Sequence, residues 1–97
     1  MQFVIICHDK PGAVALRLAT RPAHREYIQT VQSRLVHAGA MSNAAGETCG
    51  SLLVVEAADR AEAERIIAND PYSKAGLFES TAIRSYRVAI QDGERVS

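Results

Sequence analysis

Two residues in separate segments of the chain have the side-chain chemistry of a proton-transfer site. His24 lies in the segment Arg21–Tyr27, and Asp70 begins the segment Asp70–Tyr72. An imidazole titrates near neutral pH and serves as a general acid or base, while a neighbouring carboxylate orients the ring and favours its charged form. We therefore predict that a tertiary contact joins the two residues into a His–Asp acid–base pair. The alternative is a pair that only supports the fold.

Five further residues are candidates for contact with a small molecule. Arg17 and Arg21 have the guanidinium groups that bind a carboxylate or a phenolate, Ser51 and Tyr72 offer hydroxyl groups, and His8 ends a predicted strand. Each also has a structural alternative. The arginines could form a surface salt bridge or neutralise the aspartate of the pair, the serine could simply begin a strand, and the tyrosine could pack in the core.

Metal and disulfide chemistry have weaker support in the sequence. His8, His24 and Asp70 could form a facial metal site, but their spacing matches no metal-binding motif. We therefore predict no metal and no cofactor. Cys7 and Cys49 lack the Cys-x-x-Cys spacing, and we expect them to be reduced thiols rather than a disulfide.

The composition predicts one globular domain over residues 1–97. Eleven basic residues balance eleven acidic ones, and 47% of the residues are hydrophobic. No run of basic residues suggests nucleic acid or a membrane surface as a partner. The apolar runs are far shorter than the roughly 20 residues that span a bilayer, and the N-terminus lacks the basic segment of a secretory signal. We expect a cytoplasmic protein.

The first helix is predicted to carry the histidine. The apolar periodicity favours a helix over residues 22–38, with Pro22 in its first turn; residues 13–20 are expected to form a short helix or an ordered loop. On a helical wheel His24 lies at the centre of the buried stripe, and Arg25 lies on the solvent side. The remaining residues of the buried stripe are Tyr27, Ile28, Val31, Leu35 and Ala38.

The second helix is predicted to end at the aspartate. Asp59 and Glu62 have the spacing of a capping box, and Pro71 is expected to end the helix at Asp70. His24 would then lie near a helix N-terminus and Asp70 near a helix C-terminus, where each charge is unfavourable. Pairing the two side chains would relieve both conflicts.

Strands are predicted at 2–8, 40–46, 51–57 and 79–90, followed by a polar tail over 91–97 that frays. The order β-α-β-β-α-β predicts an α+β, ferredoxin-like fold, with a four-stranded antiparallel sheet and both helices on one face. The first and third strands are the most apolar and should be central. Their second face would be apolar and uncovered, so we predict a homodimer that pairs two sheets. This topology also brings the two residues of the acid–base pair to one end of the domain.

Several segments together resemble the YciI-like family (YCII-related domain) of the dimeric α/β-barrel superfamily. They are Arg17–His24 with Tyr27, Gly50–Ala57, and Asp70–Tyr72 with Ala75–Leu77. The resemblance implies a ferredoxin-like subunit, a dimer that pairs its sheets, and a His–Asp site that maps onto His24 and Asp70. Two residues depart from the family pattern: Arg25 replaces an apolar residue, and His8 replaces an aromatic one.

The resemblance also implies an activity class. One relative removes chloride from a chlorinated hydroxyhydroquinone, and other branches of the superfamily isomerise lactones or oxidise aromatic rings without a metal. We therefore expect an enzyme of the lyase (dehydrochlorinase) or isomerase type, in which His24 and Asp70 transfer protons on a small anionic aromatic or lactone-like metabolite. The alternative is a non-catalytic small-molecule-binding or accessory dimer module.

Overall fold

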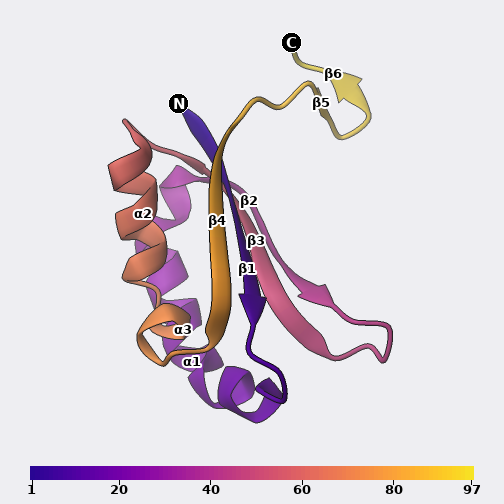
Figure 1. Ribbon diagram of the computed structural model, residues 1–97. Helices are drawn as coiled ribbons and strands as arrows, with labels where there is room; N and C mark the ends of the chain where they lie inside the picture. Colours follow the sequence, from indigo (N-terminus) through magenta and orange to yellow (C-terminus); the bar gives the residue numbers. More distant parts are fainter.

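The computed structural model describes residues 1–97 and shows one four-stranded antiparallel sheet with the helices on one face (Figure 1). The order of strands across the sheet is β2-β3-β1-β4. The predicted ferredoxin-like fold is confirmed, and so are the central positions of the first and third strands. The strands are β1 (Gln2–Asp9), β2 (Leu35–Ser42), β3 (Thr48–Glu56) and β4 (Phe78–Tyr86).

The core lies between the sheet and helix α2 (Arg60–Ala68). Along β1, Phe3, Ile5 and Cys7 are buried while the residues between them are more exposed, as the period of two in a strand requires. Phe3 and Ile5 face the helices together with their register partners on β3. The apolar cluster comprises Phe3, Ile5, Cys7, Leu53, Val55, Ala57, Ala63, Ile66, Ile67 and Ile83.

The start of α2 has one of the two hydrogen bonds of the predicted capping box. The Asp59 carboxylate accepts a hydrogen bond of 2.9 Å from the Glu62 backbone N–H. The Glu62 carboxylate accepts one of 3.3 Å from the backbone N–H of Ala58, one residue before the cap. The first bond satisfies an amide group that the helix N-terminus leaves free. No helix in the structure is long and apolar enough to cross a membrane.

The first helix begins much earlier than predicted. Helix α1 spans Val14–Val31, so residues 13–20 and the predicted helix belong to one element, with Pro22 inside it. Pro22 is on the exposed side of α1, where water can bond to the backbone carbonyl that loses its partner. A short 3-10 turn (Gln32–Arg34) then leads into β2, so the end predicted at residue 38 is wrong.

Polar contacts hold α1 in place more than apolar packing does. Arg17 is its one fully buried residue, and Ile28 is only partly buried against the core. The Tyr27 hydroxyl donates a hydrogen bond of 2.6 Å to the backbone carbonyl of Ile66 on α2. On β2, Ala38 and Ala40 are the register partners of helix-facing β3 residues, so the sheet presents small side chains to α1. These small side chains leave a cavity between α1 and this part of the sheet.

The C-terminal tail is ordered differently from the prediction. The last long strand ends at Tyr86, and the tail forms a hairpin of β5 (Ile90–Gln91) and β6 (Glu94–Arg95). Its two loop residues, Asp92 and Gly93, both have positive φ, as a type I′ turn requires. The Asp-Gly pair was the sequence signal for this turn.

No helix covers the second face of the sheet (Figure 1). Its centre contains Val4, Ile6, Leu52 and Ala82, which are half-buried, and the buried Val54. This face is the surface expected for the sheet-to-sheet pairing of two chains.

The two cysteines should differ in reactivity and in their effect on stability. Cys7 is fully buried, and burial raises its pKa to about 11. In the unfolded chain the thiol titrates near 8.5. Because the folded state retains the proton more strongly, we expect the free energy of unfolding to fall as the pH rises from about 8.5 towards 11. Urea denaturation across this range would measure the effect, and Cys7→Ala should lack this part of the pH dependence.

Alkylation supplies an independent check. Cys49 is half-buried, so iodoacetamide at pH 8 should modify it in the folded protein and leave Cys7 unmodified. In urea both thiols should react. Equal labelling of the two cysteines in the folded state would contradict the burial of Cys7.

Candidate functional site

The structure brings together His24 on α1 and Asp70 in the turn after α2. His24 Nδ1 lies 2.9 Å and 3.0 Å from the two carboxylate oxygens of Asp70. Asp70 is 1% exposed to solvent, whereas the His24 side chain is 21% exposed. Because Nδ1 is bound to the carboxylate, Nε2 is the ring nitrogen left to react with a small molecule.

The local electrostatics of the pair differ from the prediction. His24 lies well inside α1 rather than in its first turn. Asp70 does not end α2; it is the N-cap of a separate short helix, α3 (Pro71–Lys74), and accepts a hydrogen bond of 2.9 Å from the Tyr72 backbone N–H. An anionic side chain is favourable at that position. The predicted conflicts with helix dipoles are therefore absent, and the carboxylate is positioned by capping.

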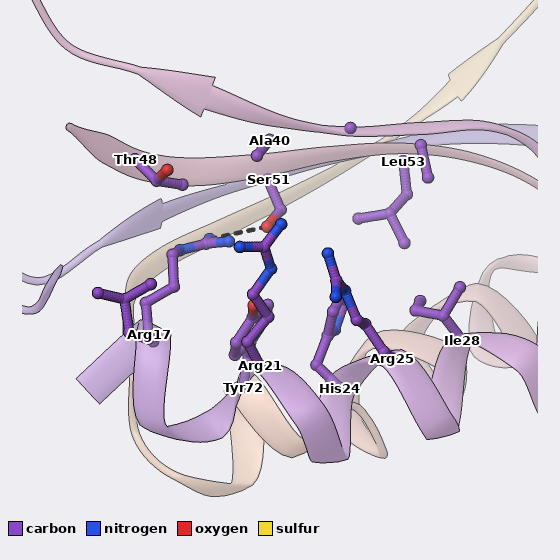
Figure 2. A pocket seen from close by; sticks show the side chains of 13 residues that line it. Arg17, Arg21, His24, Arg25, Ile28, Ala40, Thr48, Ser51, Leu53 and Tyr72 are labelled. Carbon is purple, nitrogen blue, oxygen red and sulfur yellow. Dashed lines mark hydrogen bonds between the residues drawn. The ribbon is translucent and has the colours of Figure 1, made fainter. Parts of the chain in front are cut away.

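An aromatic ring stacks on one face of the histidine ring. The rings of Tyr72 and His24 stack with their centroids 4.1 Å apart and their planes 17° from parallel. The Arg17 guanidinium lies 4.5 Å from the Tyr72 centroid. In Figure 2 the tyrosine lies between Arg17 and His24. Such contacts restrict the orientation of the imidazole.

Arg17 is the cation at the base of the site and is almost fully buried. Its guanidinium donates to both Asp9 oxygens, at 2.7 Å and 3.0 Å, and to the Ser51 hydroxyl at 2.8 Å. Burial alone would lower the pKa of Arg17, but the hydrogen bonds and charge of Asp9 raise it above its usual value. Arg17 is thus already paired within the protein.

The phenol of Tyr72 has a pKa above its ordinary value. Burial raises the pKa of Tyr72, the nearby Arg17 charge opposes the shift, and the Asp70 charge adds to it. Its side chain is 2% exposed, and a neutral phenol is the form that such a buried position favours.

A cavity of about 430 Å³ lies between α1 and the β2–β3 side of the sheet. That volume is within the range of small-molecule sites. Figure 2 shows Arg17, Arg21, His24 and Arg25 extending from α1 into this space. The lining residues are Arg17, Leu18, Arg21, His24, Arg25, Ile28, Ala38, Gly39, Ala40, Thr48, Ser51, Leu53 and Tyr72.

Most of the predicted site residues therefore meet in one place. His24, Arg17, Arg21, Ser51 and Tyr72 line the cavity, and Asp70 lies directly behind the histidine. Arg21 forms no ion pair with Asp70, which binds the histidine instead.

His8 does not join the cavity. Its neighbour Cys7 points to the helices, so the exposed His8 side chain points to the opposite face of the sheet. His8, His24 and Asp70 consequently do not form one facial set of ligands.

Two residues of the site were not predicted in their present roles. Asp9 is the partner of Arg17, and Arg25 lines the cavity although the wheel placed it on the solvent side. The predicted helix began at residue 22. A helical wheel that began at residue 14 would also have placed Arg17 on the buried stripe that contains His24, because a spacing of seven residues is nearly two full turns.

The fold is that of the dimeric α/β-barrel class of ferredoxin-like proteins. The solved structure of 5-chloro-2-hydroxyhydroquinone dehydrochlorinase (TftG) from Burkholderia phenoliruptrix AC1100, in complex with 2,5-dihydroxybenzoquinone, is similar, with a TM-score of 0.85 and 29% identity. The match covers 90% of this chain and 94% of that one. A putative antibiotic biosynthesis monooxygenase from Bacteroides thetaiotaomicron shares the fold, with a TM-score of 0.57 and 14% identity over 95% of this chain and 91% of that one.

The chain belongs to the family of the YCII-related domain, whose model matches residues 1–87. It is 34% identical to "Protein YciI" of Escherichia coli O6:H1 over 96 residues, covering 90% of this chain and 97% of the relative. The protein of the same name from Shigella flexneri matches to the same extent.

The Arg17–Asp9 pair generates a prediction about stability. Arg17→Met keeps the length of the side chain but leaves the buried Asp9 carboxylate without its partner. Removing one member of a buried ion pair costs about 3–5 kcal/mol. We expect a loss of that size in the free energy of unfolding, measured by urea denaturation.

The double variant Arg17→Met/Asp9→Asn removes both charges together. It should be more stable than Arg17→Met alone, because no uncompensated charge remains buried. If the double variant lost the sum of the two single effects, the ion pair would not be the source of the destabilisation.

Proposed function

We propose that this protein is an enzyme in which His24 and Asp70 transfer a proton on a small anionic molecule with phenolic, enolic or lactone-like character. The supporting observation is the binding of His24 Nδ1 by a buried carboxylate, beside a cavity large enough for a small molecule. The reaction would be of the lyase or isomerase type and would use no cofactor.

The chemistry follows from the two ring nitrogens. Nδ1–H donates to Asp70, so the lone pair of Nε2 accepts a proton from a carbon or oxygen of the bound molecule. The Asp70 carboxylate stabilises the imidazolium that forms. In a lyase step the electron pair left behind forms a double bond, and a leaving group departs with its own bonding pair. In an isomerase step the imidazolium returns the proton to a different atom.

The choice of substrate class rests on the similarity to the dehydrochlorinase. That enzyme acts on a chlorinated hydroxyhydroquinone and is seen with a dihydroxybenzoquinone. Here the cavity combines apolar walls from Leu18, Ile28 and Leu53 with arginines. These features suit a ring that carries acidic oxygens.

Variants of the pair test the acid–base role. We expect His24→Gln to lower turnover by about 10²–10⁴-fold, the usual contribution of a general acid–base group. Turnover should be measured on a panel of phenolic, enolic and lactone-like acids, first with the wild-type protein. Binding without turnover in the wild-type protein would instead indicate a non-catalytic binding module.

Asp70→Asn is the matched variant, because asparagine also caps helices well. It should retain the α3 cap and the fold, checked by circular dichroism, while turnover falls because the imidazolium loses its counter-charge. Unchanged turnover in both folded variants would contradict the proposed role of the pair.

We also propose that the protein is a homodimer that pairs two sheets through Val4, Ile6, Leu52, Val54 and Ala82. The support is the apolar character of this face and its lack of a covering helix. An apolar sheet face of this kind gains stability by packing on another.

Light scattering after gel filtration should give a mass of twice the 10.5 kDa chain. Leu52→Glu places a charge at the centre of the proposed interface and should shift the protein to the monomer without changing its circular dichroism. A wild-type monomer at micromolar concentration would rule out this interface.

A further inference from the structure

Two arginines of the cavity have no partner within the protein. Arg21 and Arg25 lie four residues apart on α1, are exposed, and line the cavity on either side of His24 in sequence. Neither side chain forms an ion pair or a hydrogen bond with the rest of the chain. Figure 2 shows both guanidinium groups directed from the helix towards the sheet.

The charges of the site do not cancel. Arg17 is neutralised by Asp9, and any charge on His24 is balanced by Asp70. None of the 13 residues that line the cavity is an aspartate or a glutamate. The cavity therefore has two positive charges, those of Arg21 and Arg25, that no protein carboxylate offsets.

The four-residue spacing of Arg21 and Arg25 is unfavourable for helix α1 on its own. Like charges four residues apart on a helix repel each other. Two other exposed arginines have a carboxylate partner, Arg34 in Glu62 and Arg60 in Glu64. A local penalty that the protein leaves uncompensated beside a cavity indicates a function for the charges.

From these observations we infer that the occupant of the cavity is a small dianion, with one acid group bound by Arg21 beside His24 and the second bound by Arg25. A guanidinium binds a carboxylate through two parallel hydrogen bonds. Residues four apart on a helix are separated by about 6 Å along its axis, so a compact molecule with two acid groups can reach both arginines. The inference rests on the site of the proposed function but not on its reaction.

Equilibrium binding to a set of matched probes tests the inference. Calorimetry would compare benzoate with phthalate, isophthalate and terephthalate, three dianions whose carboxylates are held at increasing separations. We expect at least one dicarboxylate to bind the wild-type protein tenfold or more tightly than benzoate. This advantage should shrink with added salt, because the arginines are exposed.

Arg25→Gln should reduce the preference for the dicarboxylate over benzoate to about twofold or less, because the second acid group loses its partner. Arg65→Gln is the control, since Arg65 is an exposed arginine on α2 outside the cavity; it should retain the full preference. If the wild-type protein bound benzoate as tightly as all three dicarboxylates, or bound none of the four probes, the inference would be wrong. It would also be wrong if Arg25→Gln kept the preference.

The outcome is independent of catalysis. A protein without turnover would still show the preference, so failure of the proposed reaction leaves the dianion inference standing. Conversely, turnover that depends on His24, found together with equal affinity for monoanion and dianions, would overturn the inference and leave the reaction intact.

Discussion

The buried ion pair between Arg17 and Asp9 is the contact on which the site depends. The Arg17 side chain of α1 contacts Asp9 at the end of β1, and it also contacts Ser51 on β3 and the face of the Tyr72 ring. A buried ion pair contributes little net stability, because desolvation offsets most of the attraction. Its value here is positional, since it fixes where the helix lies relative to three other elements.

The second part of the site follows from a three-residue turn. Asp70 caps α3 and binds His24, and two residues later Tyr72 stacks on the same histidine. Pro71, at the first position of α3, has a fixed φ that suits the start of a helix. One short segment therefore contacts the imidazole both at Nδ1 and on a ring face. The two side chains that orient the ring, those of Asp70 and Tyr72, therefore come from one short backbone segment.

Those parts of the structure that depend on a short repeating pattern could be predicted from the sequence. The alternation in β1 and β3 was sufficient for the sheet and its central strands, and the wheel placed His24 on the inner face of its helix. The start of α1 was not predictable in the same way, because Arg17 and Arg21 occupy inner positions where apolar residues are expected, and Pro22 resembles a first-turn proline. The pairing of Arg17 with Asp9 requires the tertiary contact itself.

The same residues that create the cavity weaken the packing of α1. Leucine at positions 17, 21 and 24 would let the helix close onto the sheet and bury its stripe, whereas arginine and histidine keep polar groups at the inner face. The small residues Ala38 and Ala40 on β2 leave the space opposite them unfilled. The protein thus forgoes apolar burial for a charged, partly open site, a common compromise between stability and function. The proposed anionic ligand would restore part of that loss, because it would supply the negative charges that the chain itself does not place beside Arg21 and Arg25.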